Sequence, residues 1–179
     1  YNRLKQLSGG FKKMIKKFDG DFPVSHLKFT MTNDLTDSIN AKTSNSGKYT
    51  IEIKINANTI EKRTLIGLSR TFAHEVIHAE LYRKIRSVGG KVSINDFPGI
   101  YDYYRRFKDW QHEQMAAHYI DVISDIISEF DNNNYNRQFY EDIAWEGLHK
   151  TSSWNSLSSN EISRILKNIE NLKSKKGSI

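Results

Sequence analysis

The segment His74-Glu75-Val76-Ile77-His78 constrains the chain more than any other. Two imidazoles four positions apart lie one above the other on the same face of an α-helix, so both rings can turn a nitrogen toward one ion. Glu75 lies roughly 100° further round the same helix. From there its carboxylate can reach a metal-bound water without being a ligand itself, which is the position that a general base needs. The pattern predicts a helix with two metal ligands and a base.

The sequence around this motif also predicts a helix. The stretch 64–86 contains no proline, and apolar residues recur in it at steps of three and four: Leu65, Leu68, Phe72, Val76 and Ala79. Such spacing is typical of an amphipathic helix with its apolar face against a core. The alternative is a chance pattern on a solvated helix, which arises on the order of once per hundred sequences of this composition.

A catalytic zinc ion normally has three protein ligands and one open position for water. Because the chain contains no cysteine, the third ligand has to be a histidine, an aspartate or a glutamate. A second apolar pattern predicts a long helix over 103–130, and candidate ligands gather in its segment 111–118. The candidates are His112, Glu113 and His118, with Asp102 as the main one outside this segment.

Position round this second helix separates the candidates. His112 lies close to the apolar stripe that would face the motif helix. His118 lies roughly 120° away from it, so both histidines cannot easily bind the same ion. We therefore predict a Zn²⁺ site formed by His74, His78 and His112. Glu113 and His118 stay open as alternatives, and a carboxylate does complete some zinc sites.

Shorter patterns predict the other helices. Apolar residues at helical spacing between 4 and 18 indicate a first helix that ends near residue 20. A further helix is predicted over 135–149. Ser158 and Glu161 form a capping-box pattern, which predicts the start of a last helix.

Two strands are predicted before the motif helix. Apolar and polar residues alternate over 27–31 and again over 49–55, with a polar surface connection over 33–48 between them. An exposed edge on the second strand would accept an extended peptide, although an ordinary sheet edge is the alternative. The predicted class is α+β, mainly helical, with a small sheet before the motif helix.

Length and composition fit a single domain that spans 1–179. The 37% of hydrophobic residues suffices for a globular core, and no stretch approaches the roughly 18 apolar residues of a membrane span. We expect a soluble protein. The chain begins at Tyr1 without Met or a signal segment, so we expect a processed form or an excised domain, and secretion stays open.

The net charge of +6 comes mainly from lysines near the two ends of the chain. They are Lys5, Lys12, Lys13, Lys16, Lys17, Lys167, Lys173, Lys175 and Lys176. Such clusters can bind nucleic acid or an anionic membrane surface. The apolar residues between the N-terminal lysines recur at helical spacing, however, which favours a helix that is solvated on one face. Nucleic-acid binding is therefore the less favoured alternative.

The motif helix and its surroundings resemble the zincin superfamily of metallopeptidases. The metzincin branch does not fit, because its pattern has Gly and His where this sequence has Leu81 and Lys84. The chain is more similar to SprT-like domains and related uncharacterised bacterial metallopeptidases, in which a later helix bears a third histidine. His112 matches that place, and 111–116 and 144–148 are similar to segments of the bacterial proteins.

This resemblance covers roughly 50–148 and is specific at the motif. It implies a zinc-dependent metallopeptidase that hydrolyses protein or peptide bonds, with Glu75 as the general base. Many SprT-like families add a cysteine zinc ribbon, and its absence here argues against a DNA-linked role. The alternative is a zincin-like module that binds a protein or nucleic-acid partner without turnover, but the intact Glu75 favours the enzyme.

Zinc peptidases often use a further side chain to stabilise the oxyanion. The candidates are Tyr101, Tyr103, Tyr104, Tyr119 and His149. Trp145 and Trp154 are expected either in the core or as walls of a substrate subsite.

Overall fold

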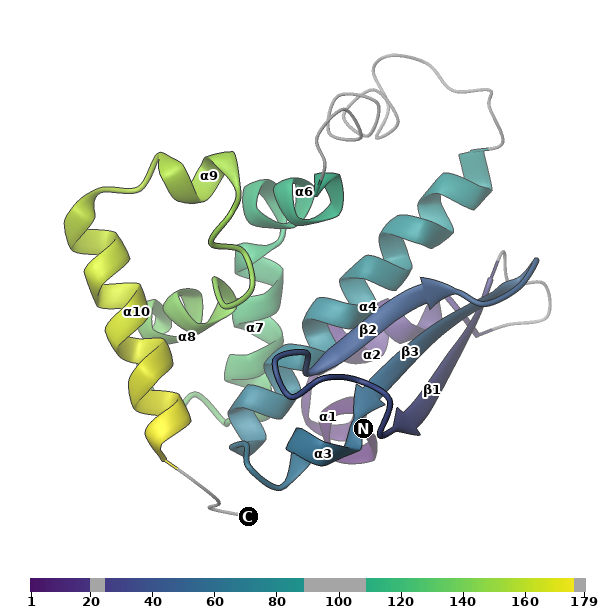
Figure 1. Cartoon of the computed structure of the whole chain (residues 1–179), viewed down its shortest axis with the longest axis horizontal. Helices are drawn as coiled ribbons and strands as arrows, with labels where there is room; N and C mark the ends of the chain where they lie inside the picture. Colours follow the sequence, from purple (N-terminus) through teal and green to yellow (C-terminus); the bar gives the residue numbers. More distant parts are fainter. Residues whose placement is uncertain (20–24, 89–108, 176–179) are drawn as a thin grey trace.

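The computed structural model describes residues 1–19, 25–88 and 109–175, with the side chains of 85–88 excepted. A small sheet forms one side of the molecule, a long helix crosses its middle, and shorter helices form the other side (Figure 1). The predicted α+β class, mainly helical with a small sheet before the motif helix, is confirmed.

The sheet has three strands in the order β1-β3-β2. Strand β1 (His26–Thr32) runs parallel to β3 (Thr50–Asn56), and β2 (Ala41–Asn45) runs antiparallel to β3 on its other side. Both predicted strands are thus present. Isoleucines at every second position of β3 point into the core, and each contributes roughly 1.5–3 kcal/mol by leaving water.

The polar stretch that was predicted as a surface connection contains β2, so that prediction is wrong. Its sequence, Ala-Lys-Thr-Ser-Asn, has no large apolar side chain, and its pairing with β3 makes it a strand. The prediction of an exposed edge on 49–55 is also wrong, because β3 is the central strand. The edge strand beside the motif helix is β2.

Helix α4 (Leu65–Val88) carries the motif and lies at the centre of the fold (Figure 1). Strands β2 and β3 contact one side of it, while α2 (Gly9–Lys16) and α7 (Ile120–Phe130) contact others. All residues over 69–81 are buried or half-buried. The sequence predicts an amphipathic helix, but contacts with the sheet and with other helices enclose this segment on several sides.

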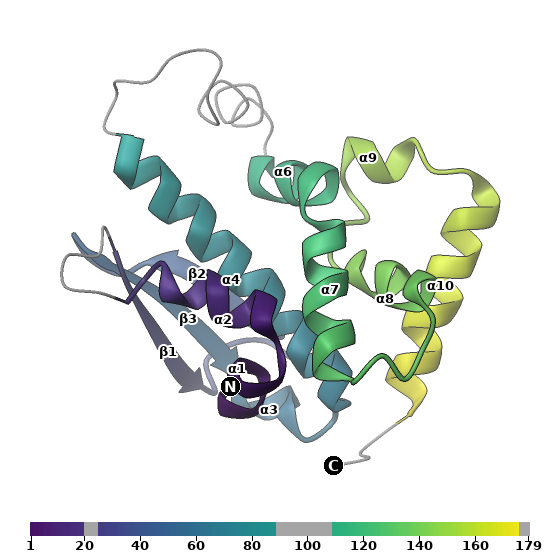
Figure 2. The ribbon, with the colours of Figure 1, turned by 180° about the vertical axis from the view of Figure 1, so that it is seen from behind.

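The described helices that follow α4 in the chain extend from it away from the sheet (Figure 2). Helix α7 packs on α4, α8 (Arg137–Ala144) packs on α7, and α10 (Ser159–Ser174) packs on α8. Helix α6 (Trp110–His118) contacts α9 (Ser152–Asn155) beside this stack. The short helix α3 (Ala57–Ile60) connects the sheet to α4.

The predicted N-terminal helix is two helices, α1 (Asn2–Leu7) and α2. They are separated at Ser8, whose backbone is extended and whose side chain caps α2. Glu129 of α7 accepts hydrogen bonds from the Ser8 hydroxyl at 2.6 Å and from the Gly10 N–H at 3.0 Å. Local periodicity cannot reveal this break, because the residue that stabilises it is more than 100 positions away.

The predicted helix over 103–130 is also divided. Residues 103–108 lie outside the described part of the chain, α6 ends at His118, and Tyr119 has non-helical backbone before α7 begins. The Tyr119 hydroxyl accepts a hydrogen bond from Lys84 of α4 at 3.1 Å. The break lets α6 run in a different direction from α7 (Figure 1). As a result, α6 reaches the motif face of α4.

The predicted helix over 135–149 is shorter than expected. Helix α8 ends at Ala144, and Gly147 has a φ of +91°, which a residue with a side chain rarely adopts. The capping box of the last helix is confirmed: the Ser158 hydroxyl accepts from the Glu161 N–H at 3.3 Å, and the Glu161 carboxylate accepts from the Ser158 N–H at 2.8 Å.

Among the helices that the structure describes, none combines the length and the apolar character that crossing a membrane requires.

Candidate metal centre

One face of α4 carries a row of functional side chains. Arg70, His74 and His78 follow one another at intervals of four residues, so they lie in line on the helix. This face lines a cleft of about 530 Å³, which is also lined by β2 and by α6. The helix therefore presents its polar row to an open space, although the helix itself is largely enclosed.

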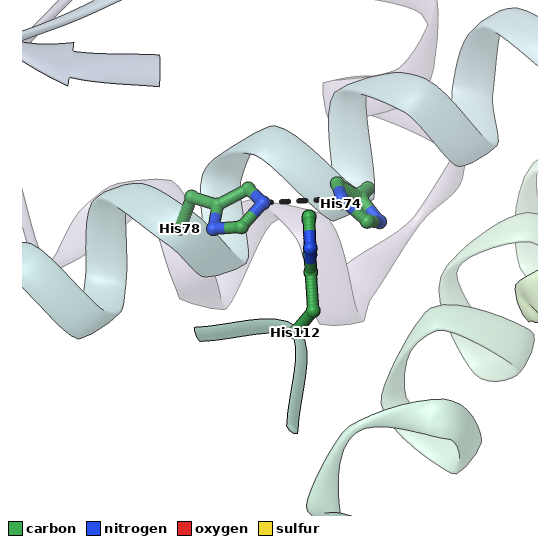
Figure 3. A group of neighbouring side chains, drawn as sticks. All are labelled: His74, His78 and His112. Atoms are coloured by element: carbon green, nitrogen blue, oxygen red, sulfur yellow. Dashed lines mark hydrogen bonds between the residues drawn. The ribbon is translucent and has the colours of Figure 1, made fainter. Parts of the chain in front are cut away.

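Three histidines meet in this cleft. His74 and His78 come from consecutive turns of α4, and His112 reaches them from the first turn of α6 (Figure 3). The Nε2 atoms of His74 and His78 are 3.1 Å apart, and one ligand atom from each of the three rings lies within 4.8 Å of the others. The structure brings together the three residues that were predicted as ligands.

The protonation states suit metal binding. Burial lowers the pKa of His74 well below its usual value, and the positive charges at His78, Arg70 and His112 act in the same direction. Burial also lowers the pKa of His78 to about 4, although its hydrogen bond with Gln111 opposes the change. These imidazoles are therefore neutral near pH 7, and a neutral ring nitrogen has a lone pair for a metal.

Gln111 orients one of the rings. Its Oε1 atom lies 2.5 Å from Nδ1 of His78, and because an amide oxygen only accepts, Nδ1 carries the proton. The lone pair of His78 is then on Nε2, which faces His74. A partner that fixes the ring nitrogen away from the metal is the usual support for a histidine ligand. The Nδ1 atom of His74 is buried and has no hydrogen-bond partner among the described residues.

This donor set fits a zinc ion. Zinc binds imidazole nitrogens at about 2.0–2.1 Å, and two ligands of a tetrahedral ion are then about 3.3 Å apart. The 3.1 Å separation in α4 is close to that value. Three imidazoles and an open cleft correspond to a catalytic site with a free position, while imidazole also suits copper, iron and nickel. The geometry supports a metal ion and does not by itself select zinc.

Glu75 lies beside the histidines with its carboxylate held in place. It is 7% exposed, and its Oε2 atom accepts a hydrogen bond of 2.6 Å from the Thr43 hydroxyl of β2. Burial raises the pKa of Glu75, while the bond from Thr43 and the charges of Arg70 and His112 oppose this change. A carboxylate with a raised pKa is a stronger base, and Glu75 lines the same cleft as the three rings.

Two of the alternative ligands, Glu113 and His118, lie outside the histidine cluster. Glu113 is buried, but its carboxylate accepts hydrogen bonds from the backbone N–H and the hydroxyl of Ser152 at the start of α9. His118 is exposed at the end of α6 and does not belong to the histidine cluster. Asp102 lies outside the described residues.

Among the predicted oxyanion-stabilising residues, His149 lines the cleft. Its Nε2 atom is buried without a hydrogen-bond partner among the described residues, and burial lowers its pKa. Its ring lies 4.3 Å from that of Trp154, which packs in turn on Trp145 in a hydrophobic cluster. The tryptophans are thus part of the core behind His149.

Of the tyrosine candidates, the one in the described part of the chain, Tyr119, does not line the cleft. Tyr119 sits at the α6–α7 break and bonds to Lys84. Tyr101, Tyr103 and Tyr104 fall outside the described residues.

The segment after α8 supports the first histidine. Arg70 donates to the backbone oxygen of Glu146 at 2.8 Å and forms an ion pair with its carboxylate at 2.9 Å. A Cβ atom on Gly147 would lie 3.6 Å from the His74 ring, so this backbone packs directly against the ligand. Glu146 and Gly147 thus belong to the surroundings of the histidine cluster.

Sequence reasoning missed Arg70, Gln111 and Thr43. Arg70 could have been found, because it lies one turn before His74 in the same four-residue row. Gln111 precedes the favoured third histidine but has no pattern of its own. Thr43 could not have been found, since its strand was not predicted.

No family model, curated protein or solved structure significantly matches this chain. Its function therefore has to be inferred from the geometry of the site.

Proposed function

We propose that this protein is a zinc-dependent peptidase that hydrolyses peptide bonds in a protein or peptide substrate. The observation that carries the proposal is the meeting of three imidazoles, the pKa values of which are all lowered by burial, with a buried glutamate that is not in their cluster. A group of metal-binding histidines alone would serve storage or structure equally well. A positioned base beside them has a use only if a water molecule is to be activated.

The chain supplies each part of such a site. His74, His78 and His112 would hold the ion, which when bound lowers the pKa of its water to about 7. Glu75 would take the proton of that water and deliver it to the departing amine, while Thr43 fixes one carboxylate oxygen. His149 would donate from Nε2 to the carbonyl oxygen as negative charge develops on it.

The edge of the sheet gives the substrate a place to bind. Strand β2 pairs with β3 on one side only, and its residues Ala41, Lys42 and Thr43 line the cleft. An extended peptide that adds to this edge through main-chain hydrogen bonds would pass in front of the histidines. Main-chain binding suits a peptide better than any other substrate class.

The test compares the parent with Glu75→Gln after both are loaded with zinc. Each is incubated with an unfolded protein and a peptide library, and cleavage is measured by mass spectrometry. We expect the parent to cleave and Glu75→Gln to lose about 10²- to 10⁴-fold in rate, because the amide cannot accept the proton. Zinc content and melting temperature should stay near those of the parent, since Glu75 is not in the ligand cluster.

Glu141→Gln is the matched control, because it makes the same chemical change on the surface of α8. Equal cleavage by the parent and Glu75→Gln would remove Glu75 from the mechanism. Absence of cleavage by the zinc-loaded parent across the whole library would favour a binding module without turnover.

A further inference from the structure

A second cavity adjoins the histidine cleft. It has a volume of about 400 Å³ and lies at the beginning of α4, where Arg63, Thr64 and Gly67 form part of its wall. We call it the Arg63 cavity. Asn40, Glu146 and Lys173 line both this cavity and the histidine cleft, so the two spaces share a wall. A ligand in the cleft can therefore extend into the Arg63 cavity.

Arg63 is a half-buried cation with incomplete hydrogen bonding. Its Nη2 atom donates to the backbone oxygen of Gly67 at 2.7 Å and to the Thr71 hydroxyl at 2.5 Å. Its Nη1 atom is buried and has no acceptor among the described residues. Both partners of Nη2 are neutral, so the hydrogen bonds of this guanidinium within the described part of the chain include none to a carboxylate.

A neighbouring guanidinium, Arg70, is paired with Glu146 but also has one N–H without an acceptor among the described residues. Arg70 is 5% exposed, and its Nε atom is also buried without an acceptor among the described residues. Burial lowers the pKa of Arg63 to about 10, and the positive charge of Arg70 acts in the same direction, against the opposing charge of Glu146. The two cations are thus close enough to repel each other.

The carboxylates nearby are already engaged. Glu146 pairs with Arg70 at 2.9 Å and with Lys173 at 2.9 Å, and Asp37 lies 3.6 Å from Lys62. The shared wall and the cavity are thus surrounded by two carboxylates, Glu146 and Asp37, and by four cations: Lys62, Arg63, Arg70 and Lys173. A buried charge without a counterion is costly, and a bound anion would remove that cost.

We propose that the Arg63 cavity is a subsite for a carboxylate group of the peptide substrate, with Arg63 as its principal donor. This inference rests on the proposed peptidase function and deepens it. The carboxylate can be the side chain of an Asp or Glu residue, or the C-terminus of the peptide. Both have the planar geometry that a guanidinium binds in two-point fashion.

The fold also indicates which part of the substrate enters the cavity. Asn40, which lines both spaces, directly precedes β2, so a peptide antiparallel to β2 would run toward the Arg63 cavity with its C-terminal part. Gly67 and His74 are seven residues apart on α4, a rise of roughly 10 Å. An extended peptide covers that distance in about three residues. The carboxylate would therefore lie about three residues after the cleaved bond.

The test measures binding separately from turnover. Zinc-loaded Glu75→Gln protein is titrated against fluorophore-labelled octapeptides of alanine and serine, with binding followed by fluorescence anisotropy. One set has an amidated C-terminus and a single Glu at each position in turn, with Gln as its uncharged counterpart. A further peptide without Glu has a free C-terminal carboxylate. We expect the carboxylate to tighten binding by at least about tenfold. A Glu preference identifies a side chain as its source, and a free-terminus preference identifies the C-terminus.

Variants in the Glu75→Gln background assign this preference to the cavity. Arg63→Gln should abolish it, Arg63→Lys should restore part of it by retaining the charge, and Lys173→Gln should reduce it. Lys12→Gln is the matched control, since Lys12 is exposed on α2 and lines neither space. If Arg63→Gln fails to melt cooperatively, Lys173→Gln decides the test, because its side chain is 63% exposed.

Three results would overturn the proposed subsite. They are equal affinity for charged and uncharged peptides, no measurable binding of either, and a preference for the carboxylate that persists in Arg63→Gln. A preference that Lys12→Gln removes equally would reflect net charge alone and would also overturn it. Hydrolysis is measured in parallel with Glu75 intact. A carboxylate preference without any hydrolysis would contradict the peptidase and leave the subsite in place.

Discussion

At the residue scale, metal binding depends most on the third histidine, His112. His74 and His78 belong to one helix, and two ligands on one helix hold an ion weakly. His112 comes from α6 and is separated from them by more than 30 positions in the chain. The site therefore depends on the tertiary packing of two elements, and substitutions in α6 test it directly.

We predict a graded loss of zinc affinity across α6. His112→Ala should weaken binding by more than about 100-fold, because it removes a ligand, and Gln111→Ala by about 10- to 100-fold, because it removes the partner of His78. His118→Ala should bind like the parent. Competition with a chelator of known affinity measures all three. A larger effect of His118→Ala than of His112→Ala would refute the assignment.

The sequence predicts these residues to different extents. His74, Glu75 and His78 follow from local spacing, and His112 follows from its position on the next apolar stripe. The supporting residues do not follow in the same way. Thr43 reaches Glu75 from a strand without apolar alternation, and the contact of Arg70 with Glu146 joins positions 76 residues apart. Contacts of that kind come from tertiary packing and leave no local pattern.

At the scale of elements, the sequence predicts which helices and strands exist better than it predicts where each of them begins and ends. The motif helix, the two strands of the parallel pair (β1 and β3) and the capped last helix all occur where periodicity and capping predict them. The breaks at Ser8 and Tyr119 depend on Glu129 and Lys84, which come from other helices. The break at Tyr119 matters for function, because α6 reaches the site only by leaving the direction of α7.

Glu113 connects α6 to α9, and we predict that it contributes to stability and not to metal binding. Glu113→Ala should lower the free energy of unfolding by about 1–3 kcal/mol, because the hydrogen bonds from the N–H and the hydroxyl of Ser152 to this buried carboxylate are lost. Urea denaturation checks this value. Glu141→Ala is the control. It removes the exposed ion pair between Glu141 and Arg137, and this loss should lower the free energy of unfolding by no more than about 0.5 kcal/mol. Loss of the bound metal with unchanged stability would show that Glu113 is a ligand.

At the scale of the whole molecule, buried carboxylates connect distant parts of the chain. Burial alone would raise the pKa of Glu80, but hydrogen bonds from Arg83 and from Lys17 of the N-terminal segment outweigh it and hold the pKa below its usual value of 4.5. Glu146 behaves in the same way: burial is outweighed by Arg70 and Lys173. Each of these carboxylates is ionised more readily in the folded protein than in the unfolded chain.

Stability should therefore fall in acid. A carboxylate with a lowered folded-state pKa contributes fully above its unfolded value near 4.5, and its contribution is lost as the pH falls through the folded value. We predict that the free energy of unfolding decreases between pH 5 and pH 3, by less in Glu80→Gln than in the parent. Urea titrations at several pH values measure the slopes, with the exposed Glu61→Gln as the control. Identical slopes in the parent and Glu80→Gln would contradict the assignment.

The placement of the histidines on two helices has one further consequence. Gln111 and His112 both contact the row on α4, and Gln111 lies 33 positions after His78 in the chain. An ion bound by all three rings would join these distant positions as a covalent cross-link does, and it would restrict the unfolded chain in the same way. The supply of metal would then determine how long the folded protein survives proteolysis.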